Sequence, residues 1–276
     1  MHVPVTAPVR TLTGESRVPA DLRALIFDVD GTLAETERDG HRVAFNRTFE
    51  EAGLDWHWDD ETYGRLLAVT GGKERMFHYW RHTDPVGADH PDASNRIAEL
   101  HRRKSEHYEA LVREGTVTLR PGIRRLLLEA RASGLRLAIA TTTSPRNVTA
   151  LIEHSIHKEA IGWFEVIGAG DDVPQKKPAP DVYLHVLREL ALHADACLAV
   201  EDSPPGLQSA LRAGIDTVVT RSTYTRSEGF AGAIATLDDL GEPDAPAFGL
   251  VHRAPWRGHV TVANLRNWHG TPAAGR

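Results

Sequence analysis

The chain has 276 residues, of which 41% are hydrophobic and 25% charged, and its 32 basic and 38 acidic residues give a formal net charge of -6. This composition is typical of a soluble globular protein that can bury a sizeable core, and the absence of a basic excess argues against nucleic acid or an anionic membrane as a partner. The single cysteine, Cys197, excludes an intramolecular disulfide and a cysteine-rich zinc site, and it favours a cytoplasmic location.

Residues 1–20 contain no apolar stretch long enough for a signal peptide or a spanning helix, so they are predicted to form a disordered extension. The first strong element follows them. The apolar run 24–27 leads into Asp28-Val29-Asp30-Gly31-Thr32, which predicts a buried strand that ends in a tight loop.

The pattern changes between residues 35 and 118. Apolar residues recur there at helical spacing, as at Val43, Ala44, Phe45 and Phe49, and no convincing strand is present. We interpret this region as an inserted small α-helical cap. The segment 83–93 is rich in Asp, Pro and Gly and is predicted to be a loop between cap helices.

Three further apolar runs, 135–140, 164–167 and 196–200, each end at polar or glycine residues and precede a helical pattern. This alternation predicts an α/β fold, in which a Rossmann-like parallel sheet is covered by helices on both faces. We assign this core to residues 21–34 and 119–240. Residues 241–276 are expected to form an extension that packs on the core, with a short strand and helix within 260–268.

Acidic residues follow two of the predicted strands. Asp28 and Asp30 come after the first, and Glu201 and Asp202 come after the run 196–200. Charges at the end of a buried element are costly unless they are paired or bind a metal, and Mg²⁺ prefers such oxygen ligands. An isolated acidic pair is more often a helix cap or a solvated loop, so the pattern alone leaves both explanations open.

Four motifs in chain order resemble those of the haloacid dehalogenase superfamily: Asp28-Val29-Asp30-Gly31-Thr32, Thr141 after an apolar run, Lys177 in Lys177-Pro178-Ala179-Pro180-Asp181, and Glu201-Asp202-Ser203. Together they are far more specific than any one of them.

The resemblance implies a catalytic role for four residues. Asp28 would be the nucleophile and Asp30 the general acid and base, while Thr141 and Lys177 would contact the transferring phosphoryl group. It also implies a Mg²⁺ ion held by the Asp28 carboxylate, the Asp30 carbonyl and Asp202. Glu201 would be a direct or an indirect ligand.

The segments 32–37, 41–46, 53–58 and 70–76 resemble the CbbY-type family, and the likeness extends over residues 22–240. It implies a sugar bisphosphatase whose partner is a small phosphorylated sugar, xylulose 1,5-bisphosphate. The protein is expected to be a monomer with no nucleic-acid or membrane partner. The residues that would contact this substrate are Glu35, Gly72, Lys73, Arg75, Thr142 and Thr143. One departure stands out, because His41 lies one residue farther from Asp30 than in many relatives, which leaves its role open.

Three alternative functions have to be compared with the pattern. A sugar phosphomutase of the β-phosphoglucomutase type shares the motifs and the cap. Phosphonate cleavage would require a cap lysine, either Lys73 or Lys104, as a Schiff base. A protein that only binds its ligand has no use for the charge-dense set of Asp28, Asp30, Lys177 and Asp202. The presence of Asp30 also argues against dehalogenation.

Overall fold

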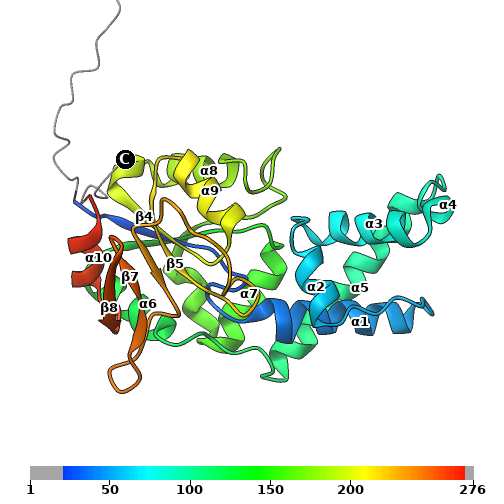
Figure 1. The fold of residues 1–276 in the computed structure, drawn as a ribbon, viewed down its shortest axis with the longest axis horizontal. Coiled ribbons are helices and arrows are strands. Elements are labelled where there is room, and N and C mark those ends of the chain that lie inside the picture. The colour runs from blue at the N-terminus through cyan, green and yellow to red at the C-terminus, as the bar shows by residue number, and fades with distance from the viewer. Residues whose placement is uncertain (1–20, 271–276) are drawn as a thin grey trace, which may run out of the picture.

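The computed structural model describes residues 21–270, so the predicted extension at 1–20 lies outside the described residues. The core is a single sheet of eight strands in the order β3-β2-β1-β4-β5-β6-β7-β8 (Figure 1). The strands from β3 to β6 are parallel, and β7 and β8 are antiparallel to their neighbours. The predicted α/β fold class is confirmed. The strands are β1 Ala24–Phe27, β2 Arg136–Ala140, β3 Phe164–Gly168, β4 Cys197–Glu201, β5 Asp216–Thr220, β6 Ala235–Leu237, β7 Ala247–Val251 and β8 Ala254–Gly258.

The strand order places the first strand beside the fourth. β2 and β3 extend the sheet on one side of β1, whereas β4 and β5 extend it on the other. Phe27 pairs with Val200, so Asp28 and Glu201 leave the sheet at the same edge. In open parallel sheets the crevice at such a reversal of strand order is where ligands bind.

Helices cover both faces of the sheet. Alternate residues of β1 point to opposite faces, since Leu25 and Phe27 join one buried cluster and Ala24 and Ile26 join another. The first face is covered mainly by α6 (Ile123–Ala132), α7 (Pro145–Ser155) and α10 (Val262–Trp268), and the second by α8 (Asp181–Leu190) and α9 (Pro204–Arg212). Two short 3-10 turns, η2 (Lys158–Trp163) and η3 (Ala194–Ala196), complete the connections.

Helices α7 and α9 begin at the carboxyl edge of the sheet. Ser144 caps α7 by accepting a hydrogen bond from the Asn147 amide, and Ser203 caps α9 by accepting one from the Gly206 amide. A proline follows each cap at the first helical position, where its missing amide hydrogen is not needed. Both turns therefore fix the loops that follow β2 and β4.

The residues between β1 and α6 form a helical unit that projects from one end of the sheet (Figure 1). It contains the π-helical turn η1 (Glu37–His41), α1 (Arg42–Glu51), α2 (Asp60–Leu66), α3 (Gly72–Thr83), α4 (Pro85–Ala88) and α5 (Ala93–Arg113). This cap has a buried cluster of its own, which includes Phe45, Phe49 and Trp58. The loop predicted at 83–93 contains the one-turn helix α4, because Asp84 caps it and Pro85 can start a helix.

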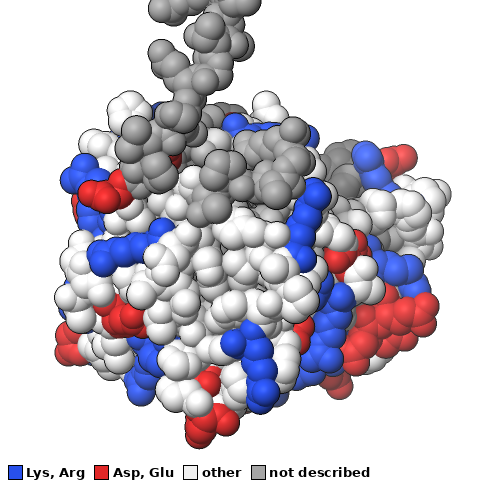
Figure 2. Space-filling model, turned by 60° about the vertical axis from the view of Figure 1, so that its left-hand side comes forward, with Lys and Arg blue, Asp and Glu red and all other residues white. Residues whose placement is uncertain are grey.

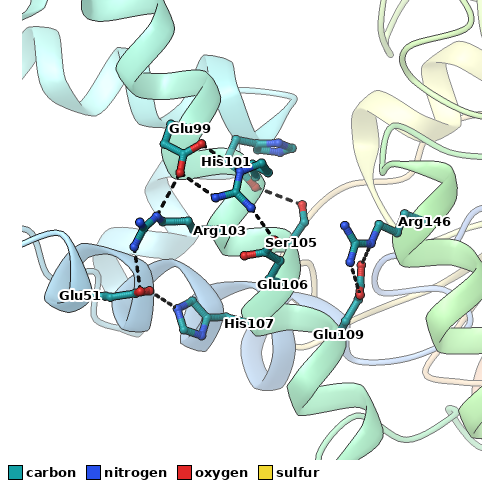
Figure 3. A network of polar contacts seen from close by, with 10 residues as sticks. Glu51, Glu99, His101, Arg103, Ser105, Glu106, His107, Glu109 and Arg146 are labelled. Atoms are coloured by element: carbon teal, nitrogen blue, oxygen red, sulfur yellow. Dashed lines mark hydrogen bonds and ion pairs between the residues drawn. The ribbon is translucent and has the colours of Figure 1, made fainter.

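Ion pairs cover the outer side of α5 (Figure 3). Glu51 of α1 binds Arg103 at 2.7 Å and His107 at 2.8 Å, and Arg103 also binds Glu99. Glu109 binds Arg146 of α7 and so joins the base of the cap to the core. Exposed pairs of this kind contribute roughly 0–1 kcal/mol each, so the apolar clusters carry most of the stability.

The chain after β6 differs from the prediction. The strand expected within 260–268 is wrong, because the hairpin of β7 and β8 precedes this segment and only the helix α10 lies within it. Trp256 of β8 packs edge-on against Trp268 of α10, with ring centroids 5.3 Å apart. Figure 2, turned to bring this side forward, shows charges of both signs interspersed over a largely uncharged face. No helix within residues 21–270 combines the length and apolarity needed to cross a bilayer.

Candidate active site

Lys177 connects the ends of three strands. Its ammonium group donates to Asp28 Oδ1 at 2.6 Å, to Glu201 Oε1 at 2.7 Å and to the Ala140 carbonyl at 2.8 Å. Lys177, Asp28 and Glu201 are all buried. The structure thus brings together the predicted nucleophile, the lysine motif and the acidic motif at the crevice beside β1 and β4.

Three buried carboxylates gather at this point. Asp28, Glu201 and Asp202 each offer an oxygen, and these oxygens all lie within 4.8 Å of one another. Burial, followed by the charges of Glu201 and Asp30, raises the pKa of Asp28 to about 7 against the opposing effect of Lys177. Burial and the charge of Asp28 likewise raise the pKa of Asp202 well above its usual value. Such a set of oxygen ligands, short of positive charge, fits a divalent cation.

Two glycines allow these carboxylates to approach the backbone. A Cβ atom at Gly31, where φ is +80°, would lie 2.1 Å from Asp202 Oδ2. A Cβ atom at Gly206 would lie 2.0 Å from Glu201 Oε2. Glu201 also accepts a hydrogen bond from the Tyr183 hydroxyl at 2.6 Å, so its carboxylate has little freedom to move.

Asp30 turns away from the carboxylate cluster. Its Oδ1 accepts a hydrogen bond from Thr36 Oγ1 at 2.7 Å and lies 2.8 Å from His41 Nε2, while His41 Nδ1 lies 2.7 Å from Lys104 Nζ. Burial alone would raise the pKa of Asp30, but His41, Thr36 and Lys104 outweigh it and hold the pKa at about 2. The side chain of Asp30 therefore stands apart from the three clustered carboxylates and is held by Thr36 and His41.

The position of His41 answers the question raised by its spacing. The turn η1 is a π-helix over Glu37–His41, and such a turn accommodates one more residue than an α-helical turn. The extra residue within Arg38-Asp39-Gly40 is absorbed there, and His41 still meets Asp30. Thr36 and Lys104 also belong to this site, although sequence reasoning gave Thr36 no role and considered Lys104 only as a Schiff-base lysine.

The threonine motif lies at the end of β2. The Thr141 amide donates to the Gly168 carbonyl at 3.0 Å, and Thr141 Oγ1 accepts from the Thr143 amide at 3.3 Å. Thr141 is buried, whereas Thr142 lines both cavities of the site and Thr143 lines one.

Two cavities meet at the seam between cap and core. The first, of about 60 Å³, is lined by the lysines Lys73, Lys104 and Lys176 and also by carboxylates that include Glu74 and Asp171; we call it the basic cavity after its lysines. The second, of about 400 Å³, contains Asp28, Lys177 and Asp202 and extends to Tyr224 in the loop after β5; we call it the catalytic cavity. Residues shared by both linings are Asp30, Glu37, Gly71, Arg75 and Thr142.

The cap residues predicted to contact the substrate differ in which cavity they line and in their partners. Lys73 and Gly72 line the basic cavity, and Lys73 forms no hydrogen bond or ion pair with other residues in the range 21–270. Arg75 lines both cavities but is buried, and it donates to the Tyr63 hydroxyl at 2.9 Å.

Glu35 lines neither cavity. Its carboxylate lies 3.4 Å from Arg120 Nε and accepts a hydrogen bond from the Thr223 amide at 3.3 Å. Glu37, two residues later, lines both cavities.

Sequence reasoning missed Lys176, Tyr183, Glu37 and Tyr224. Lys176 could have been noticed as a second cation directly before the lysine motif. The other three offer no local signal, since their places depend on how cap and core meet.

A model of the haloacid dehalogenase-like hydrolase family matches residues 22–214. The chain is 48% identical over 250 residues to the plasmid protein CbbY of Cupriavidus necator, with 90% of this chain and 97% of that protein covered. It is 54% identical over 220 residues to CbbY of Rhodobacter capsulatus, with 80% and 94% covered. A crystal structure of a CbbY mutant from Rhodobacter sphaeroides in complex with xylulose-(1,5)bisphosphate matches with a TM-score of 0.74 and 48% identity, covering 80% of this chain and 96% of that one. The chain therefore belongs to the haloacid dehalogenase-like hydrolases and, within them, to the CbbY family of enzymes.

Proposed function

We propose that this hydrolase is a Mg²⁺-dependent phosphatase that removes phosphate from a small sugar bisphosphate, xylulose 1,5-bisphosphate, through an aspartyl-phosphate on Asp28. The observation that carries the proposal is the pairing of two cavities. Asp28, Lys177 and Asp202 lie in one, and the other has three lysines in its lining. A sugar with a phosphate at each end suits this arrangement, and a CbbY relative binds such a sugar.

The chemistry follows from the contacts of each side chain. Asp28 attacks phosphorus, and Asp30 protonates the leaving sugar oxygen and later takes a proton from the water that hydrolyses the intermediate. Because the pKa of Asp30 is held at about 2, it acts as an acid only when the anionic substrate raises that pKa. Lys177 supplies positive charge beside the transferring phosphoryl group, since its three N–H groups are already donated to Asp28, Glu201 and the Ala140 carbonyl, and the Thr141 hydroxyl offers a donor.

The buried carboxylates provide the metal site in this proposal. The Asp28 carboxylate, the Asp30 carbonyl and Asp202 would hold Mg²⁺, which supplies positive charge to neutralise the phosphate oxygens. Glu201 acts indirectly, because its Oε1 accepts from both Lys177 and Tyr183 and its Oε2 accepts from the Asp202 amide at 3.3 Å.

The cap, assigned to residues 35–118, supplies specificity. Lys73 and Gly72 face the second phosphate in the basic cavity together with Thr142 and Thr143. Arg75 contributes charge at the boundary between the two cavities, and Glu35 acts from outside them through Arg120. We further propose that the protein works as a monomer in the cytoplasm, with no nucleic-acid or membrane partner.

A substrate profile of the purified protein with Mg²⁺ tests this function. Phosphate release from xylulose 1,5-bisphosphate, with little from sugar monophosphates, is the expected result. Conversion of β-glucose 1-phosphate into its 6-phosphate isomer would instead identify a phosphomutase. Turnover of neither sugar would overturn the proposed substrate class.

A further inference from the structure

Gly71 at the start of α3 leaves room for the carboxylate of Glu74. A Cβ atom at Gly71, where φ is +98°, would lie 2.2 Å from Glu74 Oε2 and 2.9 Å from Lys176 Nζ. Glu74 Oε1 accepts a hydrogen bond from Lys176 Nζ at 2.7 Å. The Glu74 carboxylate therefore lies against the backbone at Gly71.

This ion pair crosses the seam between cap and core. Glu74 comes from α3 of the cap and Lys176 from the core loop before α8, and both line the basic cavity. The two side chains keep 47% and 25% of their exposure, respectively, so the pair can open without unfolding of either part.

Two other cations of the basic cavity already have partners within the protein. Lys104 lies against His41, and Arg75 donates to the Tyr63 hydroxyl. Lys73 and Lys176 remain as the cations of this lining best placed to meet a ligand phosphate, and Glu74 neutralises Lys176. Because phosphate and the Glu74 carboxylate are both anionic, a phosphate that binds Lys176 competes with the carboxylate for the ammonium group.

We propose that Glu74 is a specificity-determining residue that guards the second phosphate site, keeping free inorganic anions off Lys176 and yielding to a phosphate delivered by an anchored bisphosphate. This inference rests on the proposed function, because it assumes that the basic cavity takes the second phosphate. A free anion has to displace Glu74 from dilute solution. A bisphosphate anchored at Asp28 presents its second phosphate at a high effective concentration and displaces Glu74 more readily.

The test is titration calorimetry with Mg²⁺ on protein carrying Asp28→Asn, which prevents turnover. Inorganic phosphate and xylulose 1,5-bisphosphate are the ligands. Glu74→Gln removes the carboxylate charge at constant size and is expected to lower the Kd for inorganic phosphate roughly 2- to 5-fold, the range that an accessible ion pair supports. In Glu74→Gln/Lys176→Gln this gain should vanish, because the gain requires the freed ammonium group.

Glu61→Gln is the matched control. Glu61 forms an ion pair with Arg65 on α2 at 2.6 Å and lines neither cavity, so its substitution should leave both Kd values unchanged. If Glu74→Gln weakens both ligands, as Lys176→Gln alone should, Glu74 only holds the cap closed and the guarding role is refuted. An unchanged Kd for phosphate refutes it as well.

The two proposals fail in different ways. Tighter binding of inorganic phosphate by Glu74→Gln, without binding of the bisphosphate by any variant, would support the guard and overturn the proposed substrate. Hydrolysis of the bisphosphate by the unaltered protein, with no effect of Glu74→Gln on phosphate binding, would leave the substrate standing and overturn the guard.

Discussion

The excess of negative charge around Lys177 explains why a cation would stabilise this site. Three carboxylates, Asp28, Glu201 and Asp202, share this one ammonium group, so the four groups together carry two negative charges when all are ionised. One divalent ion would neutralise them. The same lack of positive charge raises the pKa values of Asp28 and Asp202, because protonation removes negative charge from the buried carboxylates.

This deficit predicts how stability depends on pH. Folding raises the pKa of Asp28 from 3.8 to about 7, so the folded protein binds more protons than the unfolded chain between these values, and stability without metal falls as pH rises through that window. We expect the thermal midpoint in a chelator to be lower at pH 8 than at pH 5, and Mg²⁺ to raise it more at pH 8. Differential scanning fluorimetry measures both, and Asp202→Asn should reduce the difference.

Asp28 is expected to be essential for turnover. Asp28→Asn keeps the size of the side chain but removes the nucleophilic charge, so phosphate release should fall at least about 1,000-fold. A circular dichroism spectrum like that of the parent protein would show that the fold is retained. Sizeable residual phosphate release would assign the nucleophile elsewhere.

Lys73 is expected to lower KM for a substrate that carries a second phosphate. Loss of a charge-assisted hydrogen bond costs about 1.5–3 kcal/mol, so Lys73→Ala should raise KM for a bisphosphate about 10- to 100-fold and change that for a monophosphate little. Steady-state kinetics on both substrates decide the matter. Equal losses on the two would contradict a contact with the second phosphate.

At the scale of elements, the start of α9 controls the active site through Gly206. A Cβ atom there would lie within about 2 Å of the Glu201 carboxylate, which cannot retreat because it is buried and bonded to Lys177 and Tyr183. Helix α9 thus constrains Glu201, which accepts a hydrogen bond from Lys177, the residue that donates to Asp28.

Gly206→Ala is therefore expected to shift Glu201 and with it Lys177. A displacement of about 1 Å near the chemistry can cost roughly 100-fold in rate, and we expect a loss of kcat of that order. Gly162→Ala is a matched control, because nothing lies within 4 Å of a Cβ atom built at Gly162. An unchanged kcat in Gly206→Ala would show that Glu201 does not position Lys177.

The elements also show what the sequence could predict. Asp28 and Asp202 directly follow β1 and β4, and each of these apolar runs ends in acidic residues, so the meeting of these carboxylates at one crevice was predictable. Lys177 lies in the loop between β3 and α8, and only its family motif identified it. The contact of His41 with Asp30 depends on a π-helical turn that no local propensity specifies. The Glu74–Lys176 pair depends on the docking of α3 against the core loop, which is a long-range outcome of packing.

At the scale of the whole molecule, the outer part of the cap has an apolar cluster of its own, whereas Ala44 of α1 and Tyr108 and Leu111 of α5 belong to the cluster on one face of the sheet. Phe49 and Trp58 are fully buried in the cap cluster, with ring centroids 4.8 Å apart, and the clusters on the two faces of the sheet contain neither residue. Helices α2 and α3 therefore pack on a buried cluster separate from those of the sheet.

A cavity in the cap should weaken the cap before the sheet. Phe49→Ala removes a fully buried ring and is expected to cost about 3–5 kcal/mol of stability. Hydrogen exchange should speed up most in α1, α2 and α3, with β1 and β4 protected as before. A uniform loss of protection would show that the two parts unfold as one.

The two consecutive lysines, Lys176 and Lys177, have different sets of contacts. Lys176 reaches outward to a partner that can leave, whereas Lys177 is tied down by Asp28, Glu201 and the Ala140 carbonyl. Breaking the outer contact leaves all three inner bonds intact. The mutual contacts of Asp28, Lys177 and Glu201 consequently do not depend on the ion pair that joins α3 to the core.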